Sequence, residues 1–334
     1  MKRTTSIILV AGLLVGVLAA QALAAPVTIG ISKFVAHPAL DAVEQGIIDT
    51  LSAAGYERDV DVTYLLSDAQ ADMGVTVTIA QNFQAQDVDI VVAIATPSAL
   101  SAAQVYEGSD TPLVFAAVTD PLGAGLIISA TDPSLNGNIT GVSDLIPVGT
   151  HLSLLKELSA DIVNVGIVYN PGEPNSVKLT ELAIEAAPGL GLTIVTASAD
   201  STANVPLAAQ SLVGRVDAYY VTTDNTVVSA IDSVLAASEE AGVPFLMADP
   251  TSLASATMAA GFDYYVHGQA VGEVLLELLG GKTPSEVAPV YQAESEVHLN
   301  LDAALRIGLE FPMALIQKAT SILYGDVIFA PKAE

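Results

Sequence analysis

Short apolar runs rich in Val and Ile recur along this chain. The segments between them carry residues typical of helix starts and helix ends. Their hydrophobicity is continuous rather than alternating, which predicts strands buried on both faces, as in a parallel sheet covered by helices. His37-Pro38 opens one intervening helix that Gly55 closes, and Asp224-Asn225 caps another that Gly242 closes. The repeated β-α pattern predicts the α/β class. The predicted strands are 27–31, 60–65, 90–95, 113–117, 165–169, 192–195, 218–222 and 243–247.

The alternation of strand and helix patterns changes between Asn138 and Pro147. This stretch is interpreted as a strand that leaves one sheet, and a new helix is predicted from about Thr150. Past Gly261 the chain holds one more predicted helix (268–279) and a strand near 297–301, too little for a third domain. We expect this segment to return and complete two Rossmann-like lobes. The expected boundaries are 25–144 plus 264–292 for the first lobe, and 145–263 plus 293–334 for the second.

The first 24 residues have the three parts of a secretory signal peptide. Lys2 and Arg3 form a basic region, residues 7–20 an apolar one, and Ala22-Leu23-Ala24 a cleavage site of small residues. The apolar stretch is shorter than the roughly 20 residues that span a bilayer, so cleavage near Ala24 is expected rather than anchoring. This predicts a periplasmic protein.

Composition narrows the possible partners. The chain contains no cysteine, which excludes disulfides, thiolate metal sites and a lipid-modified cysteine. Without Lys2 and Arg3, nine basic residues remain against 37 acidic ones, a net charge of −28 that repels phosphate backbones and anionic membranes. We therefore expect no nucleic-acid partner, and a monomer.

Ligands of open parallel sheets bind beyond the carboxyl ends of the strands, so the residues that follow each strand are the candidates for a binding site. In this chain these loops are rich in hydroxyl, carboxamide and carboxylate groups. The candidate ligand-binding residues are Ser32, Lys33, Phe34, Thr96, Ser98, Thr119, Asp120, Asn175, Ser176, Asp224, Asn225, Asp249 and Tyr264.

Several stretches, taken in order, resemble the ABC transporter substrate-binding proteins of the tryptophan- and tyrosine-type, a branch of the type I periplasmic binding proteins. They are residues 32–41 (SKFVAHPALD), 114–121 (VFAAVTDP), 138–144 (NITGVSD), 169–176 (YNPGEPNS) and 223–227 (TDNTV). The resemblance covers nearly the whole mature chain. It implies two hinged lobes that hold a small ligand in their cleft and deliver it to a membrane permease, and it favours an aromatic amino acid.

Each candidate residue has a functional and a structural interpretation. Thr96 and Ser98 flank a proline at a helix start, where free N–H groups favour a carboxylate, although Thr96 is equally suited to cap the helix. Asp120 and Asp224 either accept a ligand ammonium or cap the next helix.

Asn175 and Ser176 either clamp the ligand from the second lobe or cap a helix. Phe34 and Tyr264 either face the ligand side chain or pack in the core. A cleft position of Lys33 would be electrostatically notable, because basic residues are few in this chain. Most lysines, however, are exposed to solvent.

Catalytic and metal motifs are missing from the sequence. His37, His151, His267 and His298 form no metal-binding pair and are expected to be structural or exposed. Gly281-Lys282-Thr283 lacks the earlier glycine of a phosphate-binding loop, and the stretch from Gly141 lacks the second glycine of a nucleophile elbow. We expect a non-enzymatic solute-binding protein without cofactor or metal. An exported sensor module and a secreted α/β enzyme are the alternatives, the latter with only His37 suitably placed.

Overall fold

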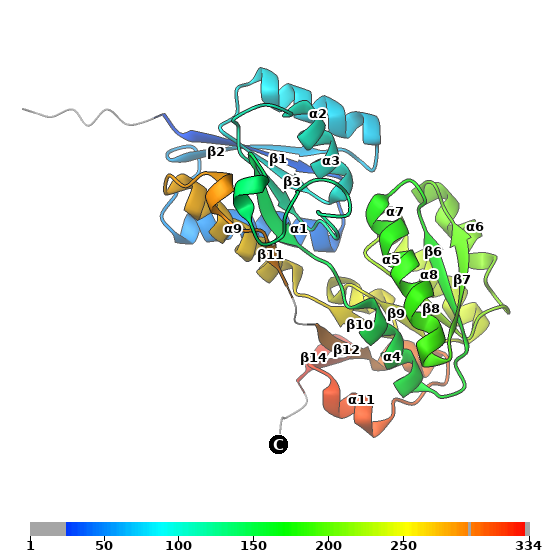
Figure 1. The fold of residues 1–334 in the computed structure, drawn as a ribbon. Helices are drawn as coiled ribbons and strands as arrows, with labels where there is room; N and C mark the ends of the chain where they lie inside the picture. The colour runs from blue at the N-terminus through cyan, green and yellow to red at the C-terminus, as the bar shows by residue number, and fades with distance from the viewer. Residues whose placement is uncertain (1–24, 293–294, 331–334) are drawn as a thin grey trace, which may run out of the picture.

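The computed structural model describes residues 25–292 and 295–330, so the predicted signal peptide lies outside the described residues. The chain forms two α/β lobes that lie side by side (Figure 1). Each lobe is built on one sheet, and we call them lobe 1 and lobe 2 in the order in which the chain starts them.

Lobe 1 contains a six-stranded, fully parallel sheet in the order β11-β5-β4-β3-β1-β2. Helices flank it on both faces (Figure 1). Its strands are β1 (Val27–Lys33), β2 (Val62–Asp68), β3 (Ile90–Ile94), β4 (Leu113–Ala116), β5 (Ile139–Ser143) and β11 (Val290–Tyr291), and its α-helices are α1 (Pro38–Ala53), α2 (Met73–Ala85), α3 (Thr96–Val105) and α9 (Tyr264–Leu279).

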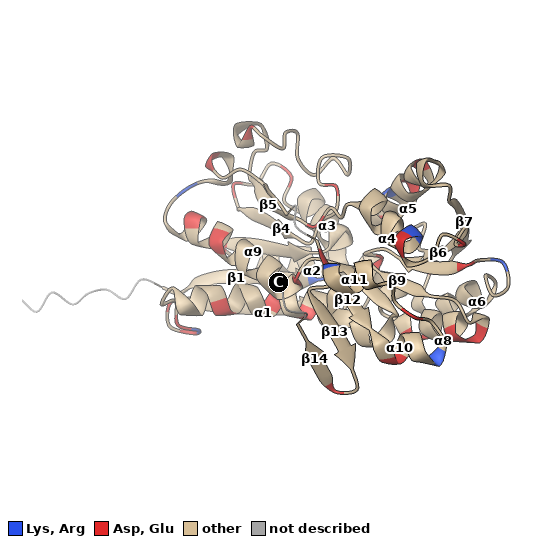
Figure 2. Cartoon of the chain, turned by 90° about the horizontal axis from the view of Figure 1, so that it is seen from below, with Lys and Arg blue, Asp and Glu red and all other residues tan. Residues whose placement is uncertain are grey.

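Lobe 2 contains an eight-stranded sheet in the order β14-β13-β12-β10-β9-β8-β6-β7, in which β10 pairs with β12, and β13 with β14, in antiparallel fashion. Figure 2 shows β12, β13 and β14 at one end of this sheet. The strands are β6 (Asn164–Tyr169), β7 (Thr193–Ser198), β8 (Ala218–Val221), β9 (Phe245–Met247), β10 (Met258–Gly261), β12 (Glu296–Asn300), β13 (Ser321–Tyr324) and β14 (Val327–Phe329). The α-helices are α4 (Val148–Leu158), α5 (Pro174–Ala186), α6 (Val205–Gln210), α7 (Asn225–Val228), α8 (Ile231–Ala241), α10 (Leu301–Arg306) and α11 (Met313–Lys318).

Local sequence explains the main boundaries. Strands β3 and β4 are buried at every position, as their continuous hydrophobicity predicts. Helix α9 begins after Asp263, whose carboxylate accepts hydrogen bonds from the N–H groups of Tyr265 and Val266, as an N-cap does. Helix α8 ends at Gly242, which adopts the left-handed conformation of a C-cap.

Helices α1 and α9 pack against each other more closely than ordinary side chains allow. A Cβ atom on Gly46 would lie 2.3 Å from the backbone oxygen of Tyr265, and one on Gly268 would lie 2.2 Å from that of Val43. The glycines therefore set the distance between the two helices. Since α9 carries Tyr264 at its first turn, this packing fixes one wall of the cleft.

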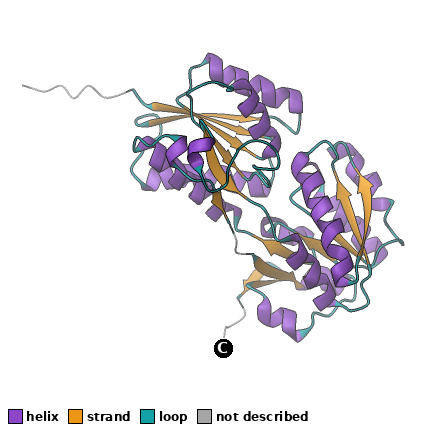
Figure 3. Cartoon of the chain, viewed as in Figure 1, coloured by secondary structure: helices purple, strands orange, loops and turns teal. Residues whose placement is uncertain are grey.

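The chain crosses between the lobes three times: between β5 and α4, between β10 and α9, and between β11 and β12 (Figure 1). The layered arrangement of helices around each sheet is visible in Figure 3. The predicted class, two lobes with mainly parallel sheets flanked by helices, is confirmed.

Two features differ from the sequence prediction. The helix expected between Asp224 and Gly242 is split into α7 and α8, because the backbone leaves the helical conformation at Ala230. Strands β10, β11, β13 and β14 were not predicted. Strand β10, with the sequence Met-Ala-Ala-Gly, consists mainly of small residues and lacks the Val and Ile enrichment that marks the predicted strands.

Acidic side chains are spread over both lobes and basic ones are sparse (Figure 2). In the part of the chain that the structure describes, no helix combines the length and hydropathy needed to cross a bilayer.

Candidate functional site

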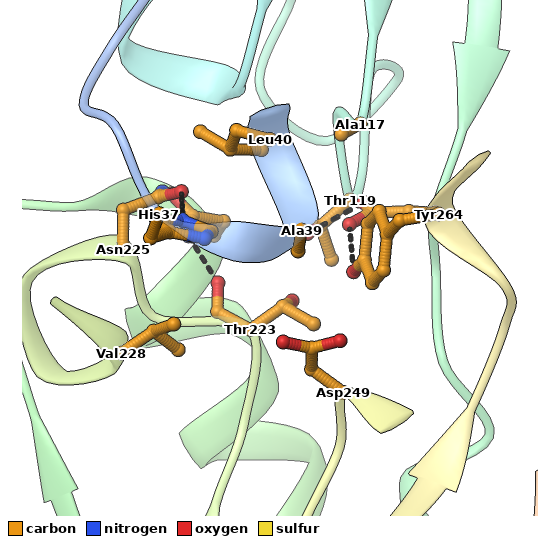
Figure 4. Close-up of a pocket in the computed structure, with 12 residues that line it drawn as sticks. His37, Ala39, Leu40, Ala117, Thr119, Thr223, Asn225, Val228, Asp249 and Tyr264 are labelled. Atoms are coloured by element: carbon orange, nitrogen blue, oxygen red, sulfur yellow. Dashed lines mark hydrogen bonds between the residues drawn. The ribbon is translucent and has the colours of Figure 1, made fainter. Parts of the chain in front are cut away.

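The loops that follow the central strands of both lobes meet around a cavity of about 330 Å³ (Figure 4). Lobe 1 contributes His37, Ala39, Leu40, Ala117, Thr119, Asp144 and Tyr264 to its lining, and lobe 2 contributes Asn175, Thr223, Asn225, Val228 and Asp249.

Two buried carboxylates face this cavity, and no Lys or Arg lines it. Asp144 accepts hydrogen bonds from the Thr119 hydroxyl at 3.2 Å and from the Tyr264 hydroxyl at 2.9 Å. Burial raises the pKa of the Asp144 carboxyl, while the charge of His267 and these two hydrogen bonds oppose the rise. A ligand cation placed beside Asp144 would favour the ionised form.

Asp249 is the second carboxylate. It caps the short turn after β9 by accepting hydrogen bonds from the N–H and the hydroxyl of Thr251, at 2.8 and 2.5 Å, and one from the Ser252 hydroxyl at 3.1 Å. Burial raises the pKa of Asp249 as well. Figure 4 shows its carboxylate directed toward the cavity. Among residues 25–292 and 295–330, no three His, Asp or Glu side chains gather in a metal-binding arrangement.

Several buried polar atoms around the cavity have no hydrogen-bond partner among the residues that the structure describes. On the cavity lining they are His37 Nδ1, Asn175 Oδ1 and Thr223 Oγ1. An unpaired buried polar group costs about 1–3 kcal/mol, so native proteins rarely keep such groups without a purpose. A polar ligand in the cavity would satisfy them.

A second group of unpaired hydroxyls lies at the start of α3: Thr96 Oγ1 and Ser98 Oγ, with Ser32 Oγ at the end of the adjacent β1. The residue that precedes the helix, Ala95, has φ +77°, and Ala117 at the end of the neighbouring β4 has φ +50°. Left-handed conformations of residues with a Cβ cost free energy and cluster at functional sites. Thr96, the first residue of α3, lines the groove described next.

The lobes also contact each other directly. Lys178 Nζ on α5 of lobe 2 lies 3.1 Å from Asp120 Oδ2 of lobe 1, and His37 Nε2 lies 3.4 Å from Asn225 Oδ1. Beside the Lys178–Asp120 pair a wider groove of about 890 Å³ is lined by Thr96 and Asn175, among others. Asn175 thus borders both the cavity and the groove.

Five of the residues selected from the sequence line the cavity: Thr119, Asn175, Asn225, Asp249 and Tyr264. Thr96 and Asp120 line the adjoining groove. The other six line neither of the two: Ser32, Lys33, Phe34, Ser98, Ser176 and Asp224.

Contacts within each lobe account for most of these six positions. Lys33 forms ion pairs with Asp41 and Glu44, and Phe34 belongs to the core of lobe 1. The fully buried Asp224 carboxylate accepts hydrogen bonds from the N–H groups of Asn170 and Val227 and from the Ser176 hydroxyl.

Asp224 is therefore the cap of α7, which was the structural alternative for this residue. Asp120 likewise accepts a hydrogen bond from the N–H of Gly123, in addition to its ion pair with Lys178.

Sequence reasoning missed seven lining residues: His37, Ala39, Leu40, Ala117, Asp144, Thr223 and Val228. His37, which was expected to be structural or exposed, is buried and lines the cavity. A signal was present for Asp144, Thr223 and His37, since each directly follows or soon follows a strand, as the selected residues do.

Two α/β lobes, three crossings and an enclosed polar cavity between them define a hinged solute-binding protein. The chain belongs to the family described as ABC transporter substrate binding protein, whose sequence model matches residues 28–323. Members of this family are binding proteins rather than enzymes, so the predicted non-enzymatic class and the family resemblance are confirmed.

Relatives with a stated ligand are among the proteins similar to this chain. It is 33% identical over 283 residues to a protein named tyrosine-binding protein from Clostridioides difficile, a match that covers 84% of this chain and 81% of that one. A Streptococcus structure described as an ABC domain in complex with L-Trp superposes with a TM-score of 0.85 at 28% identity, over 89% of this chain and 100% of that one.

A third similar structure is the ligand-free, open form of a Clostridium difficile substrate-binding protein with adhesive properties. Its TM-score is 0.65 at 31% identity, over 85% of this chain and 96% of that one. Although the sequence identity is similar, the present structure thus matches the L-Trp complex better than the open form.

Proposed function

We propose that this protein is the substrate-binding component of an ABC importer and that it captures a free amino acid, with aromatic amino acids favoured. The observation that carries the proposal is the enclosed interlobe cavity, which combines two carboxylates with unpaired polar atoms and has no lysine or arginine on its lining. A zwitterion with a buried ammonium fits this chemistry, whereas a phosphate or a dicarboxylate does not. The tyrosine and tryptophan named for two relatives support the aromatic class.

The proposed roles follow from the positions of the side chains. Asp249 and Asp144 would accept the ammonium, in place of Asp120 and Asp224, which do not line the cavity. Thr96 and Ser98, with the free N–H groups of α3, would donate to the carboxylate, because their hydroxyls are buried and unpaired.

From lobe 2, Asn175 would complete the enclosure when the lobes close. The Tyr264 hydroxyl, which donates to Asp144 from the start of α9, would lie beside the ligand's ammonium.

Calorimetric titration of the mature protein, unfolded and refolded to remove bound solute, tests the proposal. We expect binding of one or more aromatic amino acids and a loss of at least about tenfold in affinity for Asp249→Asn, since a charge-assisted hydrogen bond contributes about 1.5–3 kcal/mol. Asp161→Asn is the matched control, because Asp161 is exposed and outside the cleft. Absence of binding by any amino acid, or equal losses in both variants, would refute the proposed function.

In the cell, cleavage after the signal at residues 1–24 would release a monomer into the periplasm. The closed form would deliver its ligand to a membrane permease. The membership of β11 in the first sheet and of β12 in the second supports the proposed lobes, 25–144 plus 264–292 and 145–263 plus 293–334. Fractionation of cells that express the full chain, followed by N-terminal sequencing, tests the location and the cleavage.

A further inference from the structure

The orientation of one amide in the cleft is fixed by a buried carboxylate. Glu173 Oε2 accepts hydrogen bonds from the backbone N–H of Asn225 at 3.2 Å and from its side-chain Nδ2 at 2.6 Å. A carboxylate only accepts, so the amide NH₂ of Asn225 must point to Glu173 and its oxygen must point away. That oxygen is the atom that faces His37 across the cleft.

The amide oxygen of Asn225 in turn fixes the tautomer of His37. Because Asn225 Oδ1 only accepts, His37 Nε2 must carry a proton and donate it, at a distance of 3.4 Å. Burial lowers the pKa of His37, although Asp249 and the Asn225 hydrogen bond oppose this effect, so the ring is neutral near pH 7. In the neutral ring His37 Nδ1 then has a lone pair and acts as an acceptor. This atom is buried and has no partner within the protein.

His37 is close enough to Asp249 for that carboxylate to act on its pKa, but the two side chains come from different lobes. Figure 4 shows His37, Asn225 and Val228 on one side, and Asp249 and Tyr264 on the other. A ligand whose ammonium is held by the carboxylates would extend its side chain toward His37. The apolar Leu40 and Val228 border this part of the cavity and suit a ring.

We propose that His37 Nδ1 accepts a hydrogen bond from the ligand's side chain, and that the protein therefore selects aromatic amino acids whose ring carries an O–H or N–H donor. Tyrosine and tryptophan meet this condition and phenylalanine does not. The inference rests on the proposed function, since it assumes an amino-acid ligand. A site that is built to accept a hydrogen bond rejects an analogue without the donor, because the acceptor is then left buried and unpaired.

Tyrosine and phenylalanine differ by one hydroxyl, so they form the decisive pair. We expect calorimetric titration of the unaltered protein to give at least about tenfold tighter binding of tyrosine or tryptophan than of phenylalanine. His37→Phe keeps a ring but removes the acceptor, and should reduce this ratio to near one. His37→Gln restores an acceptor and should recover part of the preference.

The outcomes separate this inference from the proposed function. Equal affinity of the unaltered protein for tyrosine, tryptophan and phenylalanine would overturn the inference and leave the amino-acid function standing. The same holds if His37→Phe weakens all three ligands alike, since His37 would then contact the common amino-acid end or act only on closure. If no amino acid binds, both fail. Should His37→Phe not fold, the ligand ratio of the unaltered protein decides alone.

Discussion

Lys178 of lobe 2 and Asp120 of lobe 1 form an ion pair across the cleft, with Nζ 3.1 Å from Oδ2. The pair exists only when the lobes are close together, because its two members belong to different lobes. It therefore contributes to the closed arrangement and not to the stability of either lobe.

Lys178→Met should speed ligand release and weaken binding by up to about fivefold, as expected for a partly exposed ion pair worth at most about 1 kcal/mol. Stopped-flow dissociation at low salt measures the effect, which should vanish near 1 M salt through screening. Lys318→Met is the control, since Lys318 pairs with Glu157 within lobe 2. An equal effect of both substitutions would argue against a role in closure.

Ligand affinity should fall as the pH is lowered through the raised pKa of Asp249. Burial raises the pKa of this carboxyl in the ligand-free protein, whereas a bound ammonium favours the ionised form and lowers it. Binding therefore releases a proton, and acid opposes it. Titrations between pH 8 and pH 4 in buffers of different ionisation enthalpy would measure the proton release. An affinity independent of pH over this range would contradict a role for Asp249 in binding the ammonium.

The stability of the ligand-free protein should change with pH in the opposite direction. Burial, followed by the nearby carboxylate of Glu173, raises the pKa of Asp224 to about 7, above its ordinary value of 3.8. Between these values the folded state binds more protons than the unfolded state, so stability decreases as the pH rises through this window. Thermal unfolding from pH 4.5 to pH 8 measures it, and Asp224→Asn should flatten the profile relative to the unaltered chain.

Gly46→Ala should destabilise lobe 1 by about 1–3 kcal/mol or more, because the new methyl group would meet the backbone of α9 at 2.3 Å. Urea unfolding provides the measurement. Gly189→Ala is the matched control, since no atom lies within 4 Å of the added Cβ. If the two alanines proved equally tolerated, the close α1–α9 packing would not be required.

The sequence allows the fold class to be predicted because strands that are buried on both faces leave continuous apolar runs, as in β3 and β4. Strands β13 and β14 were missed because they are half-exposed or exposed at the edge of the sheet and carry no such run. The edge of the sheet where the loops that line the cavity gather was also predictable, since parallel strands end there together.

The direction of individual side chains was not predictable in the same way. Lys33 belongs to β1, and its ammonium group pairs with acidic residues of α1. The start of the same helix, by contrast, contributes residues such as His37 and Leu40 to the cavity lining. Asp224 and Asn225 are adjacent, yet one turns inward to cap α7 and the other faces the cleft. Such choices depend on hydrogen-bond partners from distant segments, such as Asn170 and Glu173.

The three crossings between the lobes also determine when the protein can fold. Strands β1 to β5 are complete by Ser143, but the core of lobe 1 includes Val271 and Leu275 of α9, and its sheet ends with β11. Lobe 2 in turn needs β12, after residue 295, to cover the edge of β10. Neither half of the molecule has its full core until nearly the whole polypeptide has been synthesised. We therefore expect the two lobes to fold together rather than one after the other.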